Sequence, residues 1–242
     1  MTWSILARDD TGAFGVAVAS RFFAVGALCP HARSGAGALA TQALVNPRYA
    51  RPGLDLLSEG TPAGEVVRLL IQDDAGRETR QLHVIDRQGR VAAHTGSGCI
   101  DWCGHLGGAD YSIAGNMLAG PQVLRETAAA YERSAGLPFA ERLLAALDAG
   151  DAAGGDKRGK QAAALRICAT EDYPLLDLRV DDHAEPFVEL RRLYEKSLER
   201  FQPFLSCLPS RTQPSGITDR AVIEDVVVRF QADLARRRGG AS

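Results

Sequence analysis

Thr2 combines the features of a nucleophile with those of its own base. Methionine aminopeptidases generally remove an initial Met that precedes a small residue, and Thr is small enough. The mature chain would then begin at Thr2, with a hydroxyl and a free α-amine on one residue. An α-amine has a pKa of ~7.7–8.0 and can take the hydroxyl proton, which activates the oxygen for attack on a carbonyl carbon. The alternative is a Met-Thr start without catalytic meaning.

Ser20 and Arg21 end an apolar segment that pairs with the first residues if the two form a simple hairpin. That register would place them opposite Thr2, where Ser20 could orient the nucleophile. Arg21 could hold a substrate carboxylate or lower the pKa of the α-amine through its charge. A polar pair that faces water at a strand end is the competing interpretation.

Two further segments could supply an oxyanion hole. Asn116 follows Gly115 at the end of an apolar segment, and its side-chain amide is a suitable donor, although a turn-forming Asn is equally compatible. His94 and Gly96 end another predicted strand, where glycine permits close approach of backbone N–H groups to a substrate. A histidine in such a place is more often structural.

The Gly-rich loop at residues 150–160 contains Asp156 and Arg158. A guanidinium can hold a substrate carboxylate through two parallel hydrogen bonds. The spacing of a phosphate-binding P-loop is absent, so a carboxylate is the better ligand. A loop closed by its own salt bridges is the alternative.

Cys99, Cys103 and His105 have a spacing that could contribute three zinc ligands. Zinc sites need three or four converging ligands, and no second cluster completes this one. We therefore expect no metal and no cofactor, and keep a Cys/His metal protein as the weakest alternative. Cys29 and Cys168 are expected to be small buried core residues.

The composition excludes several classes of protein. The chain has 242 residues and a net charge of −2, with no basic surplus for nucleic acid. It has no run of 18 apolar residues for a membrane span and no signal peptide at its start. Five scattered cysteines fit a reducing compartment. We expect a cytoplasmic protein that acts on a small molecule.

The order of predicted elements indicates antiparallel sheets covered by helices. Apolar segments bounded by turn residues predict strands at 2–7, 14–20, 35–41, 81–85, 90–94, 111–117, 161–169 and 177–180. Helical spacing of apolar residues, with Pro at starts and Gly at ends, predicts helices from 52, 62, 121, 138, 186 and 218. We divide the chain into a domain at 1–202, a linker at 203–217 and a helical extension at 218–242.

Several segments in this order resemble an uncharacterised bacterial family, domain-of-unknown-function family one-zero-two-eight. They are Thr2-Trp3-Ser4-Ile5, Phe14-Gly15-Val16-Ala17-Val18-Ala19-Ser20, Ala40-Thr41-Gln42-Ala43, Gly115-Asn116-Met117-Leu118, Gly154-Gly155-Asp156-Lys157-Arg158-Gly159 and Asp177-Leu178-Arg179-Val180-Asp181-Asp182-His183. The resemblance covers residues 2–195. It implies an α+β fold, the four-layer αββα sandwich of the N-terminal-nucleophile (Ntn) hydrolases, and by analogy a homo-oligomer.

Two hypotheses of different class follow. The first is an Ntn amidohydrolase that cleaves an amide or related C–N bond, with Thr2, Asn116, Ser20 and Arg21 as catalytic residues. His94, Gly96, Asp156 and Arg158 would bind substrate. The second is a non-catalytic ligand-binding or scaffold protein on the same fold. Removal of Met1 separates the two, because it creates the α-amine.

Overall fold

The computed structural model describes residues 2–239, and Met1, on which the processing hypothesis depends, lies outside them. The chain divides into two compact units at the bond between Leu190 and Arg191.

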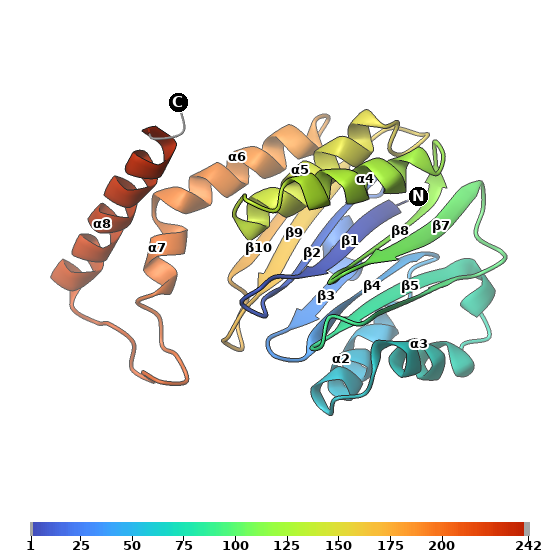
Figure 1. Ribbon diagram of the computed structural model, residues 1–242, viewed down its shortest axis with the longest axis horizontal. Coiled ribbons are helices and arrows are strands. Elements are labelled where there is room, and N and C mark those ends of the chain that lie inside the picture. The colour runs from blue at the N-terminus through green and yellow to red at the C-terminus, as the bar shows by residue number, and fades with distance from the viewer. Residues whose placement is uncertain (1, 240–242) are drawn as a thin grey trace. The chain divides into compact units, whose positions relative to one another are not determined.

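The first unit contains a six-stranded antiparallel sheet with the N-terminal strand near its middle (Figure 1). The strands lie in the order β10-β9-β2-β1-β8-β7. Their bounds are Thr2–Arg8 (β1), Phe14–Ser20 (β2), Trp102–Gly108 (β7), Tyr111–Leu118 (β8), Ala162–Cys168 (β9) and Leu176–Val180 (β10). Every residue of β2 is buried, as expected of a central strand covered on both faces.

A four-stranded antiparallel sheet in the order β3-β4-β5-β6 packs against the first sheet. Its strands are Pro30–Arg33 (β3), Gly37–Ala43 (β4), Arg80–Asp86 (β5) and Val91–Thr95 (β6). Apolar side chains of both sheets, among them Leu6, Val16, Val18 and Ile85, form one buried cluster. The two sheets are therefore held together by a shared hydrophobic core.

Helices cover the outer face of each sheet (Figure 1). The larger sheet carries α4 (Gln122–Arg133) and α5 (Phe139–Ala152), and the smaller sheet carries α2 (Ala50–Ser58) and α3 (Ala63–Gln72). The short helices are α1 (Val25–Leu28), η1 (Pro47–Tyr49) and η2 (Arg77–Thr79). The predicted four-layer αββα sandwich of antiparallel sheets is confirmed.

Trp3 shows how closely the helical layer packs on β1. Its side chain is fully buried, and its ring stacks on Phe187 with a centroid distance of 5.8 Å. A Cβ atom built on Gly150 of α5 would lie 2.7 Å from the Trp3 Nε1 atom. Glycine at this position therefore allows α5 to approach the central strand.

The structure contains elements that the sequence analysis did not predict. Strand β3 is four residues long, begins with Pro30, and is an edge strand. Strand β7 lies at the edge of the other sheet, and it contains Cys103 and His105 of the zinc hypothesis. Its three glycines and irregular polarity hide the period-two pattern from which strands are recognised. Both strands are specified by their neighbours rather than by local sequence.

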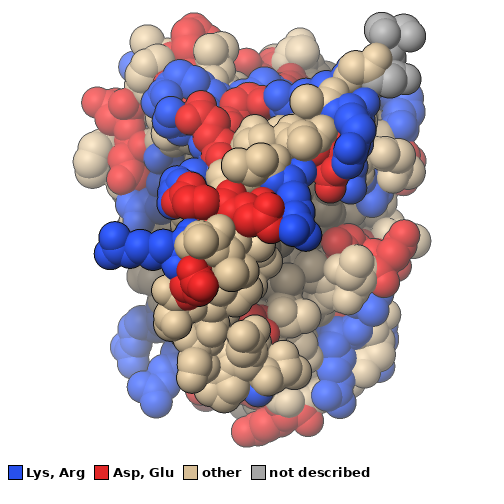
Figure 2. Space-filling view, turned by 90° about the vertical axis from the view of Figure 1, so that its left-hand side faces the viewer, with Lys and Arg blue, Asp and Glu red and all other residues tan. Residues whose placement is uncertain are grey.

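The second unit begins within α6 (Pro186–Glu199) and contains α7 (Phe201–Leu205) and α8 (Arg220–Gly239). Helix α7 extends into the segment predicted as a linker. The side chain of Arg200 binds Glu224, and Arg238 binds Glu195. Figure 2 shows acidic and basic side chains interspersed over the face that it draws. No helix of residues 2–239 combines the length and apolar character needed to span a bilayer.

Candidate active site

Thr2 lies at the start of β1, between Ser20 of β2 and Asn116 of β8. It is directly opposite both residues in the two antiparallel ladders. Directly opposed residues point their side chains to the same face of a sheet, so these three side chains meet. The Thr2 Oγ1 atom lies 3.0 Å from the Ser20 Oγ atom. The start of β1 is thus held on both sides.

Two glutamines of the smaller sheet complete the surroundings of Thr2. Gln42 Nε2 and Asn116 Nδ2 each donate to the Thr2 carbonyl oxygen at 3.3 Å. The same two amides donate to Gln81 Oε1, at 3.0 and 2.9 Å. Gln81 Nε2 donates to the carbonyl oxygen of Gly115 at 2.7 Å. Because these amides are buried, the bonds fix the Thr2 backbone relative to both sheets.

A second row of buried polar groups surrounds Ser4, which lies two residues after Thr2 on β1. Ser4 Oγ donates to Gln42 Oε1 at 2.7 Å and lies 2.8 Å from His83 Nε2. The other ring nitrogen of His83 lies 3.1 Å from Ser112 Oγ. Burial lowers the pKa of His83 to about 3, so its ring is neutral at physiological pH. This row supports Gln42 without placing a charge near Thr2.

Asp156 ties the loop after α5 to the end of β2. Its carboxylate accepts from the backbone N–H groups of Arg21 and Arg158, at 3.0 and 2.7 Å. Arg158 Nη2 also donates to Asp156 Oδ2 at 3.3 Å, and Arg21 Nη1 donates to the Arg158 carbonyl oxygen at 3.0 Å. The side chain of Asp156 is 1% exposed and that of Arg158 is 43% exposed. The buried carboxylate therefore anchors an accessible guanidinium.

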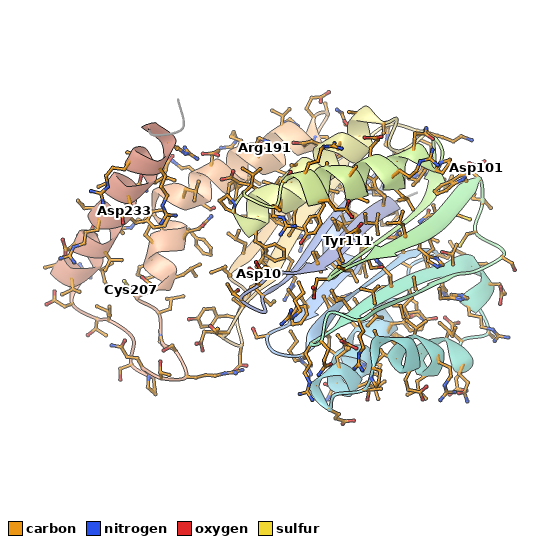
Figure 3. All side chains as sticks on the ribbon, viewed as in Figure 1. Asp10, Asp101, Tyr111, Arg191, Cys207 and Asp233 are labelled. Carbon is orange, nitrogen blue, oxygen red and sulfur yellow. The ribbon has the colours of Figure 1, made fainter. Side chains whose placement is uncertain are left out.

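A cavity of about 360 Å³ opens onto Thr2. Its volume is in the range of small-molecule sites. Its wall combines apolar side chains with two guanidinium groups, and the lining residues are Thr2, Phe22, Val25, Leu28, Cys29, Thr41, Gln42, Ala43, Leu44, Val45, Arg80 and Arg158. In Figure 3, Asp101 and Tyr111 mark opposite ends of the β7–β8 pair. Thr2 pairs with Asn116, which is near the end of β8, so Thr2 lies toward the Asp101 end of that pair.

Residues 2–190 match the profile of a family of unknown function, DUF1028. The chain belongs to this family. The crystal structure of the DUF1028 protein SPO2555 from Silicibacter pomeroyi is 33% identical, with a TM-score of 0.84 over 90% of this chain and 96% of that one. Anbu (ancestral beta-subunit) from Yersinia bercovieri is 16% identical, with a TM-score of 0.36 over 86% of this chain and 98% of its own. No curated protein matches the chain.

Within this DUF1028 chain, six of the eight predicted site residues fall into two groups. Thr2, Ser20 and Asn116 meet at one face of the larger sheet. Asp156 contacts the backbone of Arg21, and Arg158 lines the cavity with Thr2.

In the structure of this chain, His94 and Gly96 do not line the cavity. His94 pairs with Leu82 and shares its face with Ala92, which packs in the cluster beneath α3. Its Nε2 atom lies 2.9 Å from the Arg77 carbonyl oxygen. The Gly96 N–H group donates to the Arg80 carbonyl oxygen at 3.0 Å and is thereby occupied. Neither residue is among those that line the cavity with Thr2.

Sequence reasoning missed Gln42, Gln81 and His83 as parts of the site. Each is a fully or almost fully buried polar residue on a strand of the smaller sheet. A buried polar group must find a hydrogen-bond partner, so such residues mark a polar network. The available signal was a polar residue in, or directly after, a segment predicted as a strand.

The described part of this chain shows no set of ligands that would support the zinc hypothesis. Residues 2–239 contain no group of three or more His, Cys, Asp or Glu side chains arranged to hold a metal ion. Burial raises the pKa values of Cys99 and Cys103, which favours their neutral thiols over the thiolates that bind zinc.

Proposed function

We propose that this protein is an Ntn-type amidohydrolase that cleaves an amide or related C–N bond of a small molecule, with Thr2 as nucleophile. The observation that carries the proposal is the position of the Thr2 side chain. Its hydroxyl lies against Ser20, and Thr2 lines the cavity as the first residue that would remain after removal of Met1. A residue so placed can offer both its oxygen and its α-amine to a bound molecule.

The reaction follows from these two groups. Thr2 Oγ1 attacks the carbonyl carbon of the amide, and the α-amine of Thr2 takes the hydroxyl proton. The C–N bond breaks as the α-amine returns that proton to the departing nitrogen, which leaves an ester between the acyl group and Thr2. Water then attacks the ester, with the α-amine again as base, and the acid product and free Thr2 are released.

Asn116 and Gln42 serve this proposal as positioning residues. Both amides donate to the Thr2 carbonyl oxygen, which fixes the direction of the Thr2 side chain. The sequence predicts that Asn116 stabilises an oxyanion, and that role stays a prediction, because in the structure its Nδ2 atom donates to the Thr2 carbonyl and to Gln81. Ser20 is the hydrogen-bond partner that orients the nucleophilic oxygen.

Neutral surroundings favour a second candidate if Met1 is retained. The side chains that contact Thr2 through the hydrogen bonds described above, Ser20, Gln42 and Asn116, carry no charge and none is a base. Without a free α-amine, the cavity would bind a ligand and leave it unchanged. A cytoplasmic location, a small-molecule ligand and homo-oligomerisation belong to both candidates as proposals.

Substitution of Thr2 tests the catalytic proposal. In Thr2→Ala, Met1 is still removed because Ala is small, but the hydroxyl is lost. Turnover in a screen of small amides should therefore fall to background while the fold is retained. Thr2→Ser keeps a hydroxyl and should retain measurable turnover. Wild-type activity in Thr2→Ala, with unchanged thermal unfolding, would overturn the assignment of Thr2 as nucleophile.

A further inference from the structure

We infer that the cavity selects an N-acylated amino acid, with an apolar acyl chain on one side of the amide and a carboxylate on the other. This inference rests on the proposed function and names the substrate class of the same site. It follows from the division of the cavity wall into an apolar part and a cationic part, with Thr2 on the same wall.

The apolar part includes large side chains that the fold itself does not bury. Phe22 and Leu28 come from the segment after β2, and Leu44 follows β4. Their exposed fractions are 51%, 37% and 63%, high values for large apolar residues gathered at one opening. Exposed apolar side chains that converge on a cavity indicate a ligand with an apolar portion.

The backbone at this wall is held in an unusual conformation. Ala24 and Ala43 have φ angles of 53° and 67°, in the left-handed region that L-residues rarely adopt. Ala24 precedes α1, and Ala43 ends β4 immediately before Leu44. Strained residues of this kind tend to occur at binding sites, where the strain is repaid by the shape it creates. These turns direct two chain segments toward the cavity.

The cationic part contains one anchored and one accessible arginine. Arg80 donates to Asp74 and to the Leu44 carbonyl oxygen, at 3.2 and 2.5 Å, so it supports the wall. Among residues 2–239, the acceptor for the Arg158 guanidinium is Asp156 Oδ2, which engages one of its five N–H groups. Arg158 therefore retains donors for a carboxylate of the bound molecule.

Charge balance favours a carboxylate over a phosphate as the anion. Asp156 lies against Arg158 with a separation of 3.3 Å and offsets much of its charge. A phosphate monoester with two negative charges would meet repulsion from this buried carboxylate. A carboxylate, with one negative charge and two coplanar oxygens, matches the remaining N–H groups at the edge of the guanidinium.

Equilibrium binding to the Thr2→Ala protein tests the inference without requiring turnover. The probes are N-hexanoylglycine, its primary amide N-hexanoylglycinamide, and N-acetylglycine, each measured by isothermal titration calorimetry. We expect N-hexanoylglycine to bind at least roughly tenfold more tightly than either of the other two, because each of them lacks one recognised part. Equal binding of the acid and its amide, or no binding of any probe, would overturn the inference.

Two matched pairs of variants, made in the Thr2→Ala protein, assign the contacts. Arg158→Gln should weaken binding of N-hexanoylglycine by about tenfold and leave that of the amide unchanged. Lys157→Gln alters the neighbouring residue, which pairs with Asp101 outside the cavity, and should change neither. Phe22→Ala should remove the preference for the hexanoyl chain, whereas Phe23→Ala, next to it but outside the lining, should keep it. Loss in both members of a pair would contradict the assignment.

Turnover by the processed wild-type protein separates the two proposals. Release of hexanoate and glycine from N-hexanoylglycine would support both. Binding in Thr2→Ala without hydrolysis by wild type would support the substrate class and count against the nucleophile. Thr2-dependent hydrolysis of a different amide, with no binding of these probes, would support the nucleophile and overturn the substrate class.

Discussion

The hydroxyl oxygens of Thr2 and Ser20 lie 3.0 Å apart across the β1–β2 ladder, where the two residues are directly opposed. The contact joins the first side chain after Met1 to the last residue of β2. Both residues are buried, at 7% and 0% exposure, so water has little access to compete for the bond. The pairing makes Ser20 the neighbour that sets the direction of the Thr2 oxygen.

Loss of the Ser20 hydroxyl should impair catalysis more than stability. We expect Ser20→Ala to lower kcat by roughly 10–100-fold, because the nucleophile loses a partner that orients it. The free energy of unfolding should fall by about 1 kcal/mol, the usual contribution of one hydrogen bond. Kinetics and urea unfolding measure the two effects.

Ser112→Ala is the matched control. Ser112 is also buried, but it contacts His83 rather than Thr2. A comparable loss of stability is expected, with kcat close to that of wild type. Equal loss of kcat in both variants would contradict a specific role for Ser20.

His83 should make the fold sensitive to acid. Burial holds the pKa of His83 at about 3, below the ~6.5 of an unfolded histidine. The contribution of neutral His83 to the free energy of unfolding is therefore fully present above pH ~6.5. It is lost as pH falls, because the unfolded chain takes up a proton that the folded chain does not. The free energy of unfolding should fall by about 1.4 kcal/mol per pH unit below ~6.5.

His83→Gln isolates this effect from that of other groups. Glutamine can still donate and accept a hydrogen bond but does not titrate in this range. Burial also lowers the pKa values of His31 and His105, so some acid sensitivity should persist. From urea unfolding at several pH values, the free energy of unfolding of wild type should fall relative to that of the variant as pH decreases below ~6.5. A constant difference would contradict the account.

Gln81 should contribute strongly to the stability of the fold because it joins the two sheets. Gln81→Leu removes the acceptor for two buried amides and the donor to Gly115, which leaves several polar groups unpaired. We expect a loss of roughly 2–4 kcal/mol in the free energy of unfolding. Gln72→Leu, on the exposed surface of α3, should change it by less than about 0.5 kcal/mol. A small effect at Gln81 would show that the network contributes little.

The pattern of apolar segments was sufficient to predict the central strands. Residues 14–20 were predicted as a strand and form β2 with the same bounds, because a strand buried on both faces is a continuous apolar run. The edge strands β3 and β7 were not predicted. Strand β3 has only four residues and begins with Pro30, and β7 contains three glycines, so neither shows a clear period-two pattern in its local sequence.

The site was predictable only where it depends on one sheet. A hairpin that starts at Thr2 and ends at Ser20 follows from local turns, and it brings these residues together. Gln42 and Gln81 reach Thr2 from the other sheet, and packing between sheets cannot be inferred from strand patterns. His94 illustrates the same limit, because a one-residue difference in alternation decides whether a side chain faces the cavity or α3.

Two helical glycines should respond oppositely to alanine. At Gly150 an added Cβ would meet Trp3 Nε1 at 2.7 Å and Thr127 Oγ1 at 2.5 Å, so α5 would have to move from β1. We expect Gly150→Ala to destabilise the fold by about 1–3 kcal/mol. Gly64 of α3 has open space around the same position, and Gly64→Ala should stabilise by up to about 1 kcal/mol. Thermal unfolding compares them, and stabilisation at both sites would show that α5 does not press on Trp3.

The intact mass of untagged protein, purified from its own organism, tests the central claim most directly. We predict a mass lower than that of the full sequence by one methionine residue, which would place a free α-amine on Thr2 beside Ser20. A mass that includes Met1 would contradict the account, because it would remove the base on which the proposed hydrolysis depends.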